Sequence, residues 1–215
     1  MNLKNKIIVI TGGAGMLGFE FAKSINKYKG IPVILDNNKK KLNIANKFFK
    51  KNGSKYLCLD CDLSNEGDVL NKSEIILKKF KKIDCLINSA SETKNSMEVN
   101  ENKFFEKFER YDLEVFQDSI KTNLSSIFIS SKIFGTQMKK NKKGSIINIA
   151  SDVGVISPDH RIYQKNLKIN YNGVKFNTPL SYAMSKSAII GMTKYLATYW
   201  AKNNIRVNSI SPSGI

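Results

Sequence analysis

Short continuous runs of apolar residues alternate with longer segments of helical periodicity along most of the chain. Continuous apolar runs are typical of strands that a parallel sheet buries on both faces. Strand followed by helix, repeated about five times, predicts a doubly wound α/β sheet with right-handed crossovers. The predicted strands are residues 6–11, 32–36, 55–59, 84–88, 145–150 and 205–210, and the predicted helices are residues 16–28, 39–51, 65–81, 113–140 and 181–202.

Two long intervals, residues 89–112 and 154–180, interrupt this alternation. Each is longer than the few residues that usually join a strand to a helix. Both follow the carboxyl end of a predicted strand, which is the edge where open α/β sheets bind ligands. We therefore expect substrate recognition there, although a surface decoration would give the same pattern.

Length and composition indicate one soluble domain spanning residues 1–215, because no linker divides the chain and 41% of its residues are hydrophobic. No apolar run approaches the roughly 18 residues of a membrane helix, and the first residues have too short an apolar core for a signal peptide. We expect a cytoplasmic protein with no membrane partner.

The formal net charge of +17 by itself points to an anionic partner such as a nucleic acid. The Lys residues are, however, spread over predicted helix ends and turns, among many Asn and Ile residues, and no nucleic-acid-binding module is recognisable. Biased genome composition would produce the same pattern. We expect no nucleic-acid partner, while the charge can attract an anionic cofactor or substrate.

The three cysteines, Cys58, Cys61 and Cys85, are too few for a disulfide framework, which fits a reducing compartment. The first two form a C-x-x-C pair, but it lies at a predicted strand and not at the helix N-terminus that activates a redox thiol. With His160 as the single histidine, a zinc site has too few ligands. We expect buried, inert thiols and no metal.

A glycine-rich loop, "TGGAGMLG" at Thr11–Gly18, lies between the first predicted strand and the first predicted helix. Glycine lets the chain turn tightly, brings a pyrophosphate against bare backbone, and packs the helix closely on the strand. The helix N-terminus adds free N–H groups and the positive end of its dipole. This order of elements predicts a dinucleotide site, with glycines at Gly12, Gly13, Gly15 and Gly18.

Asp36 ends the second predicted strand about twenty residues after the loop. A carboxylate there accepts hydrogen bonds from the adenosine ribose and repels a 2′-phosphate, so we expect NAD more than NADP. Lys39 or Lys40, which follow closely, are in reach of such a phosphate and keep NADP open.

Taken together, the motifs resemble the short-chain dehydrogenase/reductase family over nearly the whole chain. The resemblance implies a single NAD(P)-binding Rossmann domain with three αβα layers, which oxidises or reduces a small-molecule substrate. The motifs that carry it are "TGGAGMLG" (11–18), "CDL" (61–63), "INSA" (87–90), "TNLSSIF" (122–128), "GSIINIAS" (144–151), "YAMSK" (182–186) and "IRVNSISPSG" (205–214).

The same resemblance implies site residues. Tyr182 would be the catalytic acid/base with Lys186 as its partner and ribose ligand, Ser151 would bind the reacting oxygen, and Asn123 would hold a relay water. Asp62 would lie by the adenine, and Asn88 would support the central strands. The implied cofactor-binding set is Thr11, Gly12, Gly15, Met16, Leu17, Gly18, Asp36, Asp62, Leu63, Asn88, Ser89, Ala90, Tyr182, Lys186, Pro212, Gly214 and Ile215.

The physics of "YAMSK" agrees with these roles, because residues i and i+4 of a helix share one face. Free tyrosine titrates near 10, which is too high for acid–base work at neutral pH. A cation about 4 Å away contributes on the order of 4 kcal/mol at an effective dielectric of 20, or roughly three pK units at most. We therefore expect Lys186 to lower the pKa of Tyr182.

The sequence departs from the family at several points. Met16 stands where the ordinary short members have glycine, and Ser89 and Ser91 change their Asn-Asn-Ala-Gly motif. The chain ends at "SPSGI", where the family continues with a substrate-covering segment, a helix and a last parallel strand. We expect a sheet without that strand and helix. Three explanations stay open: a fragment, a partner that covers the sheet edge, or impaired activity.

The 31 residues between Ser151 and Tyr182 form a much longer interval than is common in the family. It is similar to that of a subgroup found with enzymes of surface-polysaccharide and nonulosonic-sugar biosynthesis. This likeness implies a polar, sugar-like substrate, with His160, Arg161, Tyr163 and Lys165 as its contacts, although Arg161 fits a solvated loop equally well.

We therefore expect an NAD-dependent oxidoreductase that interconverts a secondary alcohol and a ketone by hydride transfer. A 3-oxoacyl-thioester reductase that uses NADPH is the alternative within enzymes, and an idle dinucleotide-binding scaffold is the alternative outside them. The family resemblance also implies a homodimer or homotetramer built on the helices at residues 113–140 and 181–202, although their apolar stripes suit a core as well.

Overall fold

The computed structural model describes residues 2–91, 104–163, 170–171, 174–175 and 178–213. Six parallel strands form its main sheet in the order β3-β2-β1-β4-β5-β8, which confirms the predicted doubly wound α/β fold. The strands, all close to their predicted positions, are β1 (Ile7–Thr11), β2 (Ile31–Asp36), β3 (Leu57–Asp60), β4 (Cys85–Asn88), β5 (Gly144–Ile149) and β8 (Ile205–Ile210).

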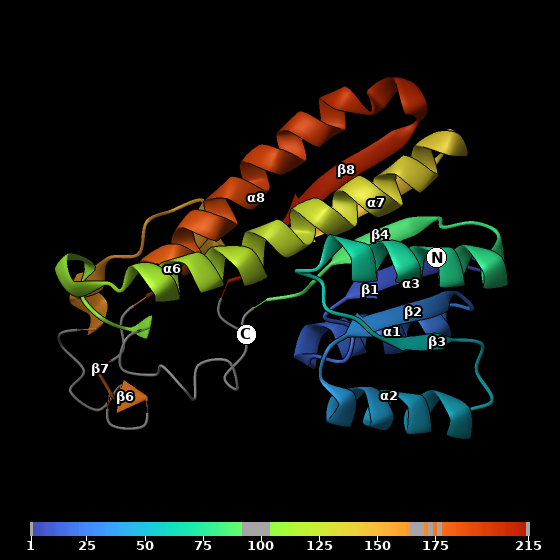
Figure 1. The fold of residues 1–215 in the computed structure, drawn as a ribbon, viewed down its shortest axis with the longest axis horizontal. Coiled ribbons are helices and arrows are strands. Elements are labelled where there is room, and N and C mark those ends of the chain that lie inside the picture. The colour runs from blue at the N-terminus through green and yellow to red at the C-terminus, as the bar shows by residue number, and fades with distance from the viewer. Residues whose placement is uncertain (1, 92–103, 164–169, 172–173, 176–177, 214–215) are drawn as a thin grey trace.

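Helices cover both faces of this sheet, which gives the three predicted αβα layers (Figure 1). One apolar cluster joins one face to the first two helices, and a second cluster joins the opposite face to the remaining long helices. The helices are α1 (Met16–Lys27), α2 (Lys39–Lys51), α3 (Glu66–Phe80), α6 (Leu113–Ile120), α7 (Ser126–Lys140) and α8 (Leu180–Tyr199).

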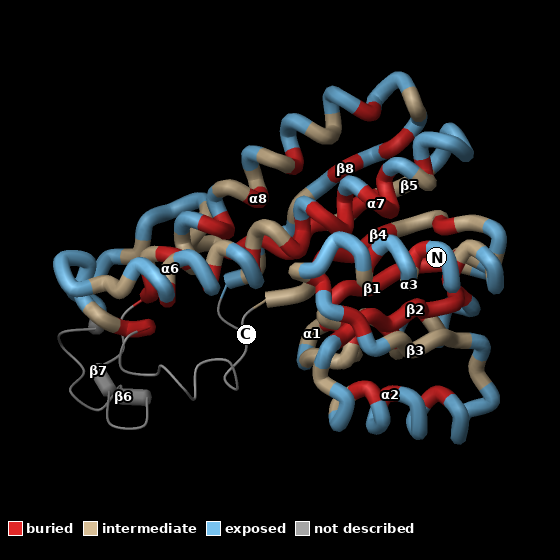
Figure 2. Tube along the Cα trace, in the orientation of Figure 1, coloured by how far each residue is buried: buried red, intermediate tan, exposed pale blue. Residues whose placement is uncertain are grey.

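The central strands are buried throughout because helices lie against both of their faces. Every residue of β1 and β2 is buried, and Val9, Ile10 and Ile34 have no exposed surface (Figure 2). Branched aliphatic side chains suit such a pleated surface with two dry faces. This burial holds the central strands in place, and their carboxyl ends form the edge of the sheet on which the site lies.

The edge strand β8 differs from this pattern. Ile205 and Val207 are buried against the sheet's helix-covered face, whereas Arg206 and Asn208 are exposed on the other. Within the described part of the chain, no helix covers that second face of β8. The expectation that every strand is buried on both faces is therefore wrong for β8.

The segment predicted as one helix over residues 113–140 contains a turn of π-helix at Lys121–Ser125, between α6 and α7. Backbone angles stay helical on both sides of this turn, so the helix does not break. A π turn holds one residue more than an α turn, and such turns are frequent at functional sites. Here it includes Asn123, whose side chain is fully buried.

The described residues of the two long intervals contain little regular structure. A 3₁₀ turn at Phe108–Arg110 precedes α6, a 3₁₀ turn at Asp152–Gly154 leads into the later interval, and a third lies within it at His160–Tyr163. The later interval also contains a short antiparallel pair, β6 (Asn170–Tyr171) and β7 (Val174–Lys175). Among the described residues, no helix is long and apolar enough to cross a membrane.

Candidate active site

The glycine-rich loop joins β1 to α1 through a turn that needs glycine at two positions. Gly12 has a φ of +61°, and a Cβ there would lie 2.7 Å from the Cα of Ala90. A Cβ on Gly18 would collide with the carbonyl oxygen of Gly12, so only glycine lets α1 start this close to the strand. The loop therefore presents bare backbone and a helix N-terminus to the space above the sheet.

Thr11 has a different place from the one expected of a cofactor contact. It is 1% exposed, and its hydroxyl oxygen accepts hydrogen bonds from the backbone N–H groups of Ser89 (3.2 Å) and Ala90 (3.3 Å). These bonds tie the end of β1 to the end of β4. Thr11 thus fixes the two loops that border the site, and it is not among the residues that line the two cavities at this edge of the sheet.

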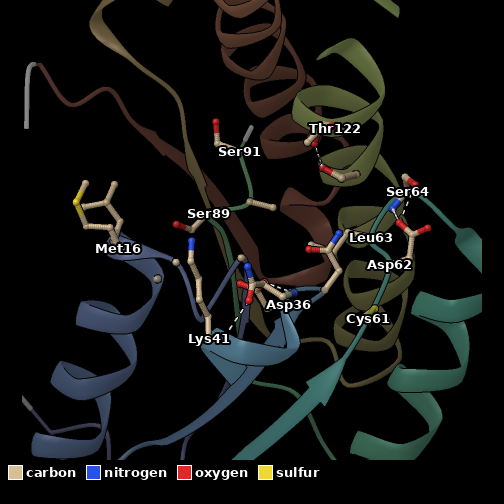
Figure 3. A pocket seen from close by; sticks show the side chains of 18 residues that line it. Met16, Asp36, Lys41, Cys61, Asp62, Leu63, Ser64, Ser89, Ser91 and Thr122 are labelled. Carbon is tan, nitrogen blue, oxygen red and sulfur yellow. Dashed lines mark hydrogen bonds between the residues drawn. The ribbon is translucent and has the colours of Figure 1, made fainter. Parts of the chain in front are cut away.

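A cavity of about 590 Å³ lies over the glycine loop at the carboxyl edge of the sheet (Figure 3). Asp36 borders it at the end of β2, where its carboxylate accepts hydrogen bonds from the backbone N–H groups of Ala14 (3.1 Å) and Asn38 (2.9 Å). The residues predicted for the cofactor that line this cavity are Gly12, Gly15, Met16, Leu17, Gly18, Asp36, Asp62, Leu63, Ser89 and Ala90.

The cation beside this cavity is Lys41, which the sequence analysis missed. Figure 3 shows its side chain extending from the start of α2 into the cavity. Lys39, one of the two candidates named from sequence, instead pairs with Asp60 at 3.5 Å and is largely exposed. The sequence did contain a signal for this placement, because Asn is a residue type that often caps a helix. Asn38 caps α2 by accepting a hydrogen bond from the backbone N–H of Lys41, which puts Lys41 in the first turn of that helix.

Asp62 and Leu63 border the far end of this cavity, beyond β3. The carboxylate of Asp62 accepts hydrogen bonds from the backbone N–H (2.9 Å) and the hydroxyl (2.7 Å) of Ser64, which hold it in a tight turn. The neighbouring thiol of Cys61 is buried, and burial raises its pKa to about 12. This thiol stays protonated at neutral pH, and burial likewise raises the pKa of Cys58 to about 11.

A second cavity of about 290 Å³ adjoins the first and shares Met16, Leu17, Ser89 and Ser91 with it. Its remaining lining comes from the end of β5, from α8 and from the segment after β8. These residues are Ile149, Ala150, Ser151, Asp152, Tyr182, Lys186, Pro212 and Ser213. The structure thus brings three of the four predicted catalytic residues, Ser151, Tyr182 and Lys186, to one cavity.

Lys186 is held inside the protein by α8. It is 3% exposed, its ammonium nitrogen donates a 2.9 Å hydrogen bond to the carbonyl oxygen of Ile149, and it lies 5.3 Å from the centre of the Tyr182 ring. Burial disfavours the charged form and lowers the pKa of Lys186 from 10.5 to about 8.

The expectation that Lys186 lowers the pKa of Tyr182 is wrong in this structure. Burial raises the pKa of the Tyr182 phenol, a hydrogen bond with Ser151 lowers it, and the negative charge of Asp152 raises it, with burial the largest effect. The reason is that Lys186 is itself desolvated and is directed at the backbone of β5. Helical spacing puts the two residues on one face but says nothing about burial.

Ser151 follows β5 with an extended backbone, and its hydroxyl donates a 2.9 Å hydrogen bond to the carboxylate of Asp152. The 3₁₀ turn that begins at Asp152 packs directly on α8. A Cβ on Gly154 would lie 2.7 Å from the backbone of Lys186, so glycine permits this close approach. The turn thereby holds Ser151 beside Tyr182.

Asn123 does not line either cavity. Its side-chain oxygen accepts a hydrogen bond from the hydroxyl of Ser91 (3.1 Å), and its amide donates to the hydroxyl of Ser119 (3.1 Å). Ser91 borders both cavities, so it connects the π turn to them. Two neighbours of Asn123, Thr122 and Ser126, border the larger cavity.

Asn88 is also fully buried beneath the site. Its amide donates hydrogen bonds to Asn148 (2.8 Å) and to Ser131 (3.0 Å), and Asn148 in turn donates to Thr193 of α8 (2.9 Å). This arrangement is the strand support expected of Asn88. It leaves Asn88 outside both cavity linings, so no direct contact with a cofactor is apparent.

The predicted substrate contacts His160, Arg161 and Tyr163 lie in the 3₁₀ turn His160–Tyr163, and Lys165 lies outside the described residues. His160 and Arg161 are not among the residues that line either cavity. The Arg161 guanidinium is exposed and forms an ion pair with Asp159 at 2.7 Å. Two further predicted residues, Gly214 and Ile215, lie outside the described residues. The polar and charged site residues that the sequence analysis missed include Lys41, Ser91, Asp152 and Ser213.

Comparison with known proteins agrees with this geometry. A family model described as short chain dehydrogenase matches residues 6–163, and one described as Enoyl-(Acyl carrier protein) reductase matches residues 166–215. An NAD-dependent glycerol dehydrogenase of Listeria innocua is 29% identical over 100% of this chain and 72% of its own length. A 3-oxoacyl-[acyl-carrier-protein] reductase of Buchnera aphidicola is 31% identical over 100% of this chain and 75% of its own length.

Among solved structures, NAD+-bound xylitol dehydrogenase superposes with a TM-score of 0.83 at 26% identity, over 99% of this chain and 72% of that one. The fold, the glycine loop and the Ser151, Tyr182 and Lys186 cavity therefore coincide with a family match that spans most of the chain. The chain belongs to the short-chain dehydrogenases, which are oxidoreductases that act on CH–OH groups by means of a nicotinamide dinucleotide.

Proposed function

We propose that this protein is an NAD-dependent dehydrogenase, a single domain over residues 1–215, that interconverts a secondary alcohol and a ketone on a polar, sugar-like substrate. One observation carries the proposal: Ser151, Tyr182 and Lys186 meet in a cavity that opens beside the cavity of the glycine loop. A substrate in the smaller cavity and a dinucleotide in the larger one would be neighbours.

The residues present fit such a dinucleotide. The loop offers bare backbone at Gly12, where a Cβ would overlap Ala90, and the helix N-terminus at Gly15 faces the larger cavity. Asp36 at the other side is a suitable acceptor for ribose hydroxyls. When bound, the nicotinamide accepts or supplies the hydride.

The remaining chemistry falls to residues of the chain. Tyr182 moves a proton to or from the substrate oxygen, and Ser151 hydrogen-bonds that oxygen from the end of β5. Lys186 lies behind Tyr182 and, with a pKa of about 8, is close to the point of changing its charge near neutral pH. We also propose that the π turn at Asn123, through Ser91, supports a route for protons between the two cavities.

NAD is the proposed cofactor because the carboxylate of Asp36 lines the ribose end of the larger cavity and would repel a 2′-phosphate. Lys41 favours NADP, since its side chain enters the same cavity. The carboxylate is the stronger argument, because it is held in place by two backbone N–H groups.

A polar substrate is supported by the hydroxyl and carboxylate groups of Ser151, Asp152 and Ser213 in the smaller cavity. Relatives that carry the names glycerol dehydrogenase and xylitol dehydrogenase act on polyols. The identity with a 3-oxoacyl-[acyl-carrier-protein] reductase keeps reduction of a 3-oxoacyl thioester as the second candidate.

We propose further that the chain works as a dimer or tetramer. Large apolar side chains are exposed along α7 and α8, among them Phe128, Tyr195 and Tyr199, and the two tyrosine rings stack on each other. Light scattering of the purified protein tests this, and a monomer at all concentrations would contradict it.

The activity is tested by following nicotinamide reduction with a panel of polyols, and nicotinamide oxidation with the matching ketones and a 3-oxoacyl thioester. Tyr182→Phe should reduce kcat by at least about 10²-fold, since it removes the acid–base group. Tyr28→Phe, at an exposed tyrosine that lines neither cavity, is the matched control. Equal rates in Tyr182→Phe and the wild type would exclude the proposed mechanism.

A further inference from the structure

Asp152, directly after Ser151, makes several hydrogen bonds that have no role in the proposed reaction. Its Oδ1 accepts hydrogen bonds from the hydroxyl of Ser151 (2.9 Å) and from the backbone N–H of Val153 (2.8 Å). Its Oδ2 accepts one from the hydroxyl of Ser213 (2.9 Å), and its backbone N–H donates to the carbonyl oxygen of Pro212 (3.0 Å). All these residues except Val153 line the smaller cavity.

The direction of the hydrogen bond between Ser151 and Asp152 is fixed by chemistry. An ionised carboxylate has no proton to give, so the hydroxyl must be the donor. Asp152 is ionised near neutral pH, because the hydrogen bonds from Ser151, Ser213 and Val153 lower its pKa. While Tyr182 is protonated, the single proton of the Ser151 hydroxyl is therefore committed to Asp152, and only an ionised Tyr182 competes for it.

This commitment changes what Ser151 offers to a substrate. A hydroxyl has one proton and two lone pairs, so a serine whose proton is engaged can still accept hydrogen bonds. A substrate alcohol brings an O–H donor that such a lone pair can accept. A substrate ketone brings only lone pairs, and those oppose the lone pairs of Ser151 unless the bond to Asp152 breaks.

We propose that Asp152 is a positioning residue that holds Ser151 as a hydrogen-bond acceptor and thereby makes the site bind the alcohol in preference to the ketone. The inference rests on the proposed function, and it adds a preference between the two forms of the substrate. The reaction's overall equilibrium constant is unaffected, so the preference appears in binding and not in the final yield.

A second branch of the same carboxylate allows a matched control. Oδ2 joins Ser213, in the segment after β8, to Asp152, and this bond does not involve the proton of Ser151. Ser213→Ala therefore removes one hydrogen bond to Asp152 without freeing Ser151. Asp152→Asn keeps an amide oxygen for Ser151 but has no charge, and Asp152→Ala removes the acceptor altogether.

The test measures KM in both directions for an alcohol–ketone pair that the wild type converts, starting with glycerol and dihydroxyacetone and then xylitol and xylulose. In Asp152→Ala, the ratio of the alcohol KM to the ketone KM should rise by up to about tenfold, which is the effect of one hydrogen bond gained or lost at the neutral Ser151 hydroxyl. Asp152→Asn should restore most of the wild-type ratio, and Ser213→Ala should keep it. If Asp152→Ala does not fold, Asp152→Ser should raise the ratio by about threefold.

The outcomes separate this inference from the proposed function. A wild type that oxidises no alcohol and reduces no ketone overturns both. An active wild type whose KM ratio stays the same in Asp152→Ala, or whose two KM values change by one common factor, overturns the role of Asp152 alone. A thermal unfolding midpoint like that of the wild type shows that each variant is folded.

Discussion

The ammonium nitrogen of Lys186 donates a 2.9 Å hydrogen bond to the carbonyl oxygen of Ile149, the last residue of β5. This bond joins the helix that carries Tyr182 to the strand that leads to Ser151. The bond thereby fixes the position of Tyr182 and Lys186 on α8 relative to Ser151, which follows β5. The lysine is almost fully enclosed, so its charge state and the stability of the fold depend on each other.

The first prediction concerns that dependence. The folded pKa of Lys186, about 8, lies below its unfolded value of about 10.4, so the unfolded chain binds more protons between these two pH values. The free energy of unfolding should therefore rise with pH across this window, by at most about 3 kcal/mol from this group. Below about pH 8 the cost of burying the charge remains in full.

Urea unfolding at several pH values between these limits measures this contribution. In Lys186→Met the rise should disappear, whereas Lys39→Met, which removes an exposed lysine, should keep it. A wild-type free energy of unfolding that falls with pH in this window after correction by Lys186→Met would show that the buried lysine is not destabilising when charged.

A second prediction concerns the pKa of Tyr182. Burial raises it most, a hydrogen bond with Ser151 lowers it, and the carboxylate of Asp152 raises it further, while Lys186 lies against the ring. Asp152→Asn removes the negative charge, so the phenol should ionise at a lower pH. Asp159→Asn removes a carboxylate of the same interval that pairs with Arg161, and it should leave the titration unchanged.

Ultraviolet difference titration follows this ionisation, with Tyr182→Phe as the blank that isolates one of the eight tyrosines. The acid limb of the pH–rate profile for alcohol oxidation should move in the same direction as the titration. A shift to higher pH in Asp152→Asn would reverse the assigned influence of Asp152.

A third prediction compares two glycines. Gly18→Ala places a methyl group against the carbonyl oxygen of Gly12, where α1 packs on the strand, and should lower the free energy of unfolding by about 1–3 kcal/mol. Gly191→Ala on α8 meets no atom within 4 Å and should raise it by about 0.5–1 kcal/mol, because alanine favours helix. Thermal or urea unfolding of both variants gives the comparison. Equal effects would show that α1 can move away from the loop.

A fourth prediction separates the two charges, Asp36 and Lys41, that border the larger cavity at the end of β2 and the start of α2. Asp36→Ala should weaken NAD(H) binding by about tenfold and improve the relative affinity for NADP(H), since it removes a hydrogen-bonded, negatively charged group. Lys41→Gln should weaken NADP(H) more than NAD(H), while Lys39→Gln, whose charge pairs with Asp60, should change neither. Calorimetric titration of each cofactor provides the dissociation constants. An unchanged preference in Asp36→Ala would remove the argument for NAD.

The sheet and most helices could be predicted from sequence because apolar runs and helical periodicity report burial directly. The β8 segment, "IRVNSI", in fact alternates at Arg206 and Asn208, so its half-exposed character was readable too. The π turn at Asn123 was not, because the same backbone angles and composition suit an ordinary α turn. Its position depends on packing between distant elements.

The candidate site, like the fold, could be predicted from sequence only in part. Tyr182, Lys186 and Ser151 were found from local motifs, and the structure brings them together. The contacts of Asp152 with Ser213 join segments 61 residues apart, so no local pattern announces them. The direction of the Tyr182 pKa shift was missed because it depends on burial, which spacing along a helix does not reveal.

The buried amides beneath the site also specify how the strands align. Asn88 and Asn148 are directly paired in the register of β4 and β5, and they hydrogen-bond each other. A slip of β5 by one residue would set Asn88 against Ile147 or Ile149 and would separate the two amides, at a cost of about 1–3 kcal/mol for each lost partner. Two polar residues in an otherwise interchangeable run of aliphatic side chains thus encode a single alignment, and with it the height at which Ser151 leaves the sheet.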